Sequence, residues 1–124
     1  MRILLVDDEY ELVSTLAERM VLRGYDTDWA TSGEDALEKI RTQAYDVVVI
    51  DVKMPKMSGI ELKDRMQEAR PGMKYIFITG HGSRSDFMNV PAETRDQFYL
   101  LKPVGIELLI RKIHEAVADE GEAP

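Results

Sequence analysis

The sequence predicts an α/β protein with a doubly wound, five-stranded parallel sheet flanked by five helices. Short β-rich runs alternate with segments of helical periodicity throughout the 124 residues. The run DVVVID at residues 46–51 has the continuous apolar stretch that a parallel strand covered on both faces requires. This alternation indicates right-handed crossovers and helices on both faces. At this length we expect one domain over residues 1–118, with residues 119–124 as a C-terminal tail or the start of a linker.

The first two strands and the helix between them follow from the spacing of apolar residues. Residues 2–6 are apolar after Arg2 and predict the opening strand. Apolar residues recur at helical spacing from Leu12 onward, and the helix is expected to end at Gly24, a position typical of a helix C′ glycine. Residues 26–30 predict a second strand, whose polarity indicates the edge of the sheet.

Serine caps predict the starts of two further helices. Ser32 is followed by Asp35 three residues later, and Ser58 with Glu61 has the spacing of a capping box. We expect the first of these helices to bury an apolar face made of Ala36, Leu37, Ile40 and Ala44. The second is expected to end near Pro71.

The last third of the chain predicts two strands and two helices. Residues 75–79 and 98–101 form the predicted fourth and fifth strands. Few apolar residues between them fall in helical register, and Pro91 would interrupt a helix near its middle, so we expect a short or distorted fourth helix. The final helix begins near Ile106 and carries an apolar stripe up to Val117.

Composition excludes several classes of function. The formal net charge of -7 disfavours unaided binding to nucleic acids or to anionic membranes. The chain has no cysteine, which excludes disulfides, thiolate catalysis and cysteine-based metal sites. Because the sequence shows neither a signal peptide nor an apolar stretch near the ~20 residues that span a bilayer, we expect a cytoplasmic protein.

Charged and polar residues stand at the carboxyl ends of the predicted strands. Asp7 and Asp8 follow the first strand, Asp51 ends the third, Thr79 ends the fourth and Lys102 follows the fifth. Ligands of doubly wound sheets bind at this edge, so we expect these side chains to converge there.

Such a cluster suits phosphoryl chemistry with a bound metal. Two carboxylates about 5 Å apart repel by ~3 kcal/mol at an effective dielectric constant of about 20, so the cluster needs compensating charge. Carboxylate oxygens are hard ligands that suit Mg²⁺, and Lys102 adds a further positive charge. A carboxylate can also act as a nucleophile toward a phosphoryl group, whose transfer needs mainly positioning and charge neutralisation.

Four motifs carry a resemblance to a known family. They are VDDE at residues 6–9, VIDVKMPKMSG at 49–59, IFITG at 76–80 and YLLKP at 99–103. In this order and at these strand ends, they make the sequence resemble a response-regulator receiver domain of bacterial two-component signalling, over essentially the whole chain. The resemblance implies the flavodoxin-like strand order 2-1-3-4-5.

The resemblance also implies a metal site. Asp51 would be the phosphoacceptor, and Asp8 and Asp51 would ligate Mg²⁺ directly. The backbone carbonyl of Lys53 would be a third ligand, and Asp7 would act through a water molecule.

Further residues resemble the switch machinery of the family. Thr79 would bind one phosphoryl oxygen, and Lys102 would pair with another. Tyr99 resembles the switch aromatic, which turns inward once Thr79 moves toward the phosphate. Lys102-Pro103 resembles the family's cis peptide bond.

The implied partner is a sensor histidine kinase or a phosphotransfer protein, which donates a phosphoryl group from a phosphohistidine. The receiver then switches conformation to control an output partner or domain. We expect no enzymatic activity beyond its own phosphorylation and dephosphorylation, no direct nucleic acid binding and no membrane partner. A homodimer is compatible with this function.

Three other functions use similar features. A Mg²⁺-dependent phosphatase with a phosphoaspartyl intermediate needs the same residue types, but its nucleophile normally follows the first strand and a covering cap is usual. A flavodoxin-like FMN binder would place its phosphate loop where Asp7 to Glu9 repel anions. A third alternative is an interaction module that is never phosphorylated, which the complete set of site residues disfavours.

Overall fold

The computed structural model describes residues 1–80 and 98–121, which form a five-stranded parallel sheet between two layers of helices. The strands are β1 (Arg2–Val6), β2 (Asp26–Ala30), β3 (Val47–Asp51), β4 (Lys74–Thr79) and β5 (Phe98–Leu101). Their order is β2-β1-β3-β4-β5, which confirms the predicted topology and places the polar strand β2 at an edge. The described helices are α1 (Tyr10–Leu22), α2 (Gly33–Thr42), α3 (Gly59–Ala69) and α6 (Ile106–Gly121).

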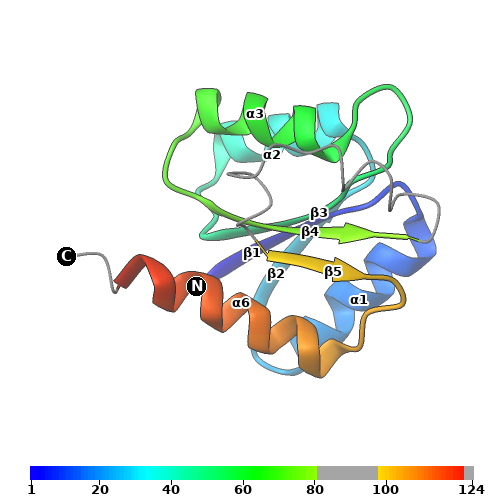
Figure 1. Ribbon diagram of the computed structural model, residues 1–124, viewed down its shortest axis with the longest axis vertical. Helices are drawn as coiled ribbons and strands as arrows, with labels where there is room; N and C mark the ends of the chain where they lie inside the picture. The colour runs from blue at the N-terminus through cyan, green and yellow to red at the C-terminus, as the bar shows by residue number, and fades with distance from the viewer. Residues whose placement is uncertain (81–97, 122–124) are drawn as a thin grey trace.

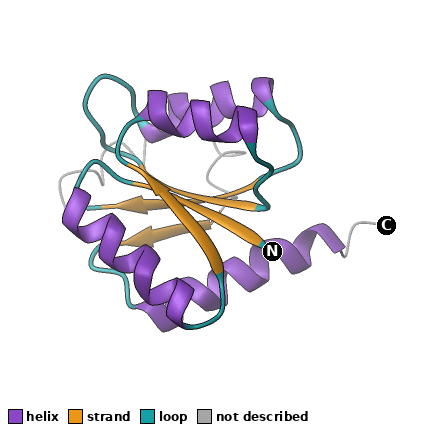
Figure 2. Cartoon of the chain, turned by 180° about the vertical axis from the view of Figure 1, so that it is seen from behind, coloured by secondary structure: helices purple, strands orange, loops and turns teal. Residues whose placement is uncertain are grey.

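The sheet separates two hydrophobic cores. Helices α2 and α3 cover one face, and α1 and α6 cover the other (Figures 1 and 2). Alternate residues of β1 face opposite sides, so Leu4 packs in the α2 and α3 layer while Leu5 packs in the α1 and α6 layer. All five residues of β3 are buried, as its continuous apolar run predicts for a central strand.

The predicted helix signals are confirmed in detail. The backbone N–H groups of Asp35 and Glu61 donate to the hydroxyls of Ser32 and Ser58, each at 3.1 Å. Both serines therefore cap their helices. Gly24 follows α1 with a φ of 91°, the left-handed conformation that favours glycine at a helix C′ position.

One predicted inward position is wrong. Ala44 is exposed because α2 ends at Thr42, and the chain is already extended at Gln43, where φ is -140°. Leu12, where the helical spacing begins, is 47% exposed and lines a mainly apolar cavity of about 400 Å³ between α1 and the segment that follows β5.

Two further predictions concern the end of the chain and the fourth helix. Helix α6 continues to Gly121, so the predicted domain end at residue 118 falls inside it, and the boundary stays a prediction. The distorted helix expected around Pro91 falls at residues 81–97, outside the described residues.

Candidate functional site

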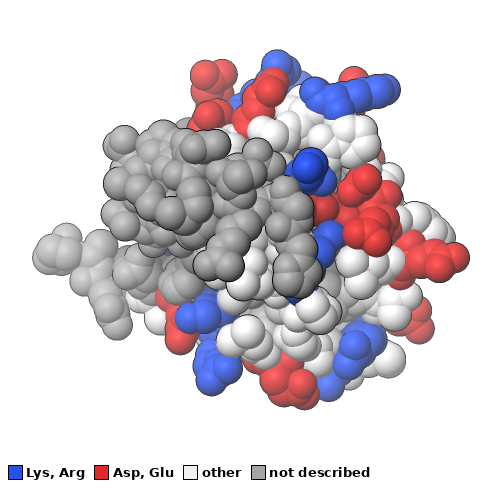
Figure 3. Space-filling view, turned by 45° about the vertical axis from the view of Figure 1, so that its right-hand side comes forward, with Lys and Arg blue, Asp and Glu red and all other residues white. Residues whose placement is uncertain are grey.

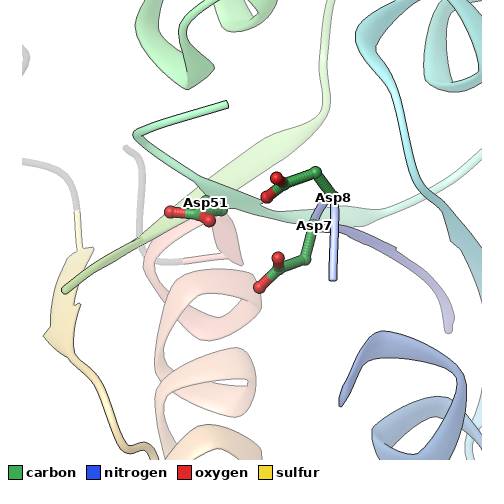
Figure 4. A group of neighbouring side chains, drawn as sticks. All are labelled: Asp7, Asp8 and Asp51. Carbon is green, nitrogen blue, oxygen red and sulfur yellow. The ribbon is translucent and has the colours of Figure 1, made fainter. Parts of the chain in front are cut away.

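Three carboxylates meet beyond the carboxyl ends of β1 and β3 (Figure 4). Asp7, Asp8 and Asp51 each offer one oxygen, and these oxygens lie within 4.8 Å of one another. Asp7 and Asp51 are buried, whereas Asp8 is exposed. Oxygen ligands at this spacing are compatible with one hard cation, so the cluster is a candidate metal site.

The register of the sheet produces this convergence. Strands β1 and β3 are parallel neighbours with Val6 opposite Ile50, so the residues that follow these two lie side by side. The backbone N–H of Asp7 donates to the carbonyl of Ala30 at 3.1 Å, which fixes the chain where the acidic pair begins. The predicted gathering of Asp7 and Asp51 at this edge therefore follows from parallel pairing.

Lys102 joins the acidic residues from β5. Its Nζ atom lies 3.0 Å from Asp7 Oδ2, 3.1 Å from Glu9 Oε1 and 3.2 Å from Asp51 Oδ2. The peptide bond between Lys102 and Pro103 is cis, as expected. The Lys102 backbone N–H also donates to the carbonyl of Thr79 at 2.8 Å, so the lysine is anchored to the end of β4.

Burial and neighbouring negative charges shift the pKa values of two residues of the site. Burial, followed by the nearby charge of Asp7, raises the pKa of Asp51, while Lys102 partly offsets this rise. For Lys102 itself, burial lowers the pKa, but the hydrogen bond and charge of Asp7 and the charge of Asp51 outweigh it and raise the pKa overall. The ammonium therefore stays protonated as the counter-ion of the cluster.

The loop after β3 approaches the strand closely. A Cβ atom at Gly59 would meet the carbonyl oxygen of Asp51 and would lie 2.8 Å from Ile50 Cγ2. The N–H of Gly59 donates to the Val52 carbonyl at 2.7 Å, and that of Lys53 donates to Asp51 Oδ1 at 3.2 Å. Glycine therefore allows the loop to fold back over Asp51. The role of the Lys53 carbonyl as a metal ligand stays a prediction.

The structure places the predicted switch residues on neighbouring strands. Thr79 is buried at the end of β4, one residue beyond the position that pairs with Asp51. Tyr99 lies on β5 opposite Phe77, and their rings stack with centroids 5.0 Å apart. The switch roles of Thr79 and Tyr99 stay predictions, and the stacking partner Phe77 was missed because its position depends on the pairing of two strands.

Glu9 is a further site residue that the sequence analysis quoted but gave no role. It reaches Lys102 across 93 positions in the chain. The sequence feature that could have indicated a role for Glu9 was its place directly after the acidic pair, at the start of α1.

Figure 3 turns the carboxyl ends of the strands toward the viewer and shows acidic side chains gathered there, with basic side chains beside them.

A comparison with family models matches residues 3–114 to the response regulator receiver domain. The chain belongs to this family. As a receiver domain it is part of two-component signalling, and the parallel sheet with an acidic cluster at its carboxyl edge fits that membership.

Similar proteins include full regulators and single receiver domains. The chain is 34% identical over 122 residues to the transcriptional regulatory protein GlrR of Escherichia coli, covering 98% of this chain but 27% of that protein. It is 30% identical to the response regulator receiver protein CpdR of Brucella abortus, covering 92% of this chain and 94% of that protein.

Solved structures agree with this membership. A response regulator receiver domain protein from Methanospirillum hungatei is 30% identical, with a TM-score of 0.83 and 98% of each chain covered. A receiver domain protein from Clostridium thermocellum is 27% identical, also with a TM-score of 0.83, covering 97% of this chain and 96% of that one.

Among the helices that the structure describes, none has the length and hydropathy to cross a membrane.

Proposed function

We propose that this receiver domain accepts a phosphoryl group from a partner histidine kinase onto Asp51, with Mg²⁺ as cofactor, and changes conformation in response. The observation that carries the proposal is the position of the buried Asp51 carboxylate. It lies 3.2 Å from the Lys102 ammonium and within 4.8 Å of oxygens from Asp7 and Asp8. A nucleophilic carboxylate is thereby held among the positive charge and the metal ligands that phosphoryl transfer requires.

In the proposed transfer, an oxygen of Asp51 forms a bond to phosphorus while the bond from phosphorus to the donor's imidazole nitrogen breaks. The imidazole leaves with the electron pair of that bond and takes up a proton from solvent. Lys102 pairs with the negative charge that the phosphoryl oxygens bring into the site. The Lys53 N–H, which donates to Asp51 Oδ1 at 3.2 Å, orients the attacking carboxylate.

The donor set of the cluster fits the proposed metal. Asp8 and Asp51 would hold Mg²⁺ directly, together with the Lys53 carbonyl, and Asp7 would act through water. When bound, the metal supplies positive charge that neutralises the phosphoryl oxygens during transfer. All of these ligands are carboxylate, carbonyl or water oxygens, which hard cations prefer.

Thr79 and Tyr99 are the residues that couple phosphorylation to a change of conformation. Thr79 binds a phosphoryl oxygen, and the half-buried Tyr99, whose ring already stacks on Phe77, then packs further inward, which shifts a two-state equilibrium that exists before phosphorylation. The domain catalyses only its own phosphorylation and dephosphorylation, in the cytoplasm. We propose that an output domain or partner reads the switched surface; relatives named as transcriptional regulatory proteins are longer than this chain.

Incubation with acetyl phosphate and Mg²⁺ is expected to add one phosphate per chain, measured by mass spectrometry of the intact protein. Asp51→Asn removes the nucleophile and should abolish the addition, and chelation of Mg²⁺ should do the same. Asp64→Asn is the matched control, because Asp64 is exposed on α3 and is expected to leave labelling unchanged. Equal labelling of Asp51→Asn and wild type would contradict the proposal.

A further inference from the structure

Lys102 is held by three carboxylates, of which Glu9 differs from the other two. The side chains of Asp7 and Asp51 are only 10% and 7% exposed, whereas that of Glu9 is 62% exposed. Water can therefore solvate the Glu9 carboxylate as soon as it leaves Lys102. Release of either aspartate would instead leave a buried charge without its partner, which is far more costly.

Glu9 stands directly before α1, and the helix does not use its carboxylate. Glu9 is the N-cap residue, yet no capping hydrogen bond from its side chain is found among the described residues. Residues that cap well at this position are serine, threonine, aspartate and asparagine. The backbone is fixed separately, because the Glu9 N–H donates to Asp7 Oδ1 at 3.0 Å. The Glu9 side chain can thus move while the acidic pair keeps its place.

A phosphoryl oxygen that pairs with Lys102 must share or replace one of these contacts. A lysine ammonium has three N–H donors, and three carboxylates already lie within 3.2 Å of Nζ. The contact to Glu9 is the one whose loss is compensated by water. The incoming oxygen is also an anion, so it can take over the hydrogen bond that Glu9 gives up.

We propose that Glu9 is a placeholder anion, which occupies Lys102 in the unphosphorylated domain and is displaced by the phosphoryl group. The inference rests on the proposed function of Asp51. It adds Glu9 as a positioning residue, which sets how readily Lys102 can pair with a phosphoryl oxygen. Glu9 thereby holds the ammonium near Asp51 before transfer and lowers the affinity of the site for a phosphoryl group.

The test is the affinity for beryllofluoride, a phosphoryl mimic, at saturating Mg²⁺. Glu9→Gln weakens the pairing with Lys102, and the affinity is expected to rise about two- to fivefold, the range that corresponds to one exposed ion pair. Glu9→Asp keeps the charge but shortens the side chain by one methylene, so it loses its reach to Lys102 and should tighten binding similarly. The new aspartate is a good N-cap, so α1 is not weakened.

Glu11→Gln is the matched control. Glu11 lies two residues further along, is exposed in the first turn of α1, and forms none of the ion pairs found among the described residues. Its substitution should leave the beryllofluoride affinity within a factor of about 1.5, as for a surface charge without a partner.

Two outcomes would overturn the placeholder role. Wild-type affinity in Glu9→Gln would show that Glu9 does not compete for Lys102. Tighter binding in Glu9→Gln alone, with Glu9→Asp equal to wild type, would assign the effect to repulsion through space. Both outcomes leave the proposed function standing, provided that wild type binds beryllofluoride and Asp51→Asn does not. If wild type fails to bind, the proposed function and the inference fall together.

Discussion

Gly59→Ala is expected to lower the free energy of unfolding by about 3 kcal/mol and the melting temperature by about 10 °C. The added Cβ would meet the carbonyl oxygen of Asp51 and would lie 2.9 Å from Val52 Cα. Both atoms belong to the backbone at the end of the central strand β3, so neither can move without shifting the acceptor residue itself. The same substitution is therefore expected to reduce phosphorylation from acetyl phosphate.

Urea denaturation followed by circular dichroism measures the loss of stability. Gly80→Ala is the control, because a Cβ there meets no described heavy atom within 4 Å. Its free energy of unfolding should stay within about 0.5 kcal/mol of wild type. Equal stability of the two variants would show that the loop after β3 relaxes freely and does not constrain Asp51.

Lys102→Met is expected to destabilise the metal-free domain by about 3 kcal/mol, because removal of one partner leaves buried charges uncompensated. Asp7 and Asp51 are both buried and would repel each other without the ammonium between them. Added Mg²⁺ should restore most of the loss, since a divalent cation can replace the missing positive charge.

The measurement is thermal unfolding with and without Mg²⁺ at one pH. Lys39→Met provides the comparison, because Lys39 pairs with Asp28 at 3.7 Å and both side chains are about a third exposed. That pair should contribute at most about 1 kcal/mol and should not respond to Mg²⁺. A loss in Lys102→Met that is identical in the presence and absence of Mg²⁺ would contradict the counter-ion role.

Features set by neighbouring residues could be predicted from the sequence. The caps at Ser32 and Ser58 need only a hydroxyl at the right offset from an N–H, and the buried strand at residues 47–51 needs only an apolar run. The end of α2 could not be predicted in this way. Ala44 continued the apolar spacing, but the pairing of Asp46 with Arg2 draws the chain into an extended path before the helix could include it.

In the candidate site, too, some residues could be predicted from the sequence and others depend on contacts between distant segments. Its acidic members were predictable because parallel strands bring their carboxyl ends to one edge, and Asp7 and Asp51 come directly after paired residues. The contact between Glu9 and Lys102 was not predictable, because it depends on how a side chain at the start of α1 meets the end of β5. The close approach of Gly59 to Asp51 also depends on the path of a loop.

Titration of the domain with Mg²⁺, followed by isothermal calorimetry, tests most directly whether the acidic cluster binds one divalent ion at the acceptor. We expect a single site in wild type, an affinity at least about tenfold weaker in Asp51→Asn because a ligand and its charge are lost, and unchanged affinity in Asp64→Asn. Equal Mg²⁺ affinity in wild type and Asp51→Asn would show that the ion, if bound, is held elsewhere.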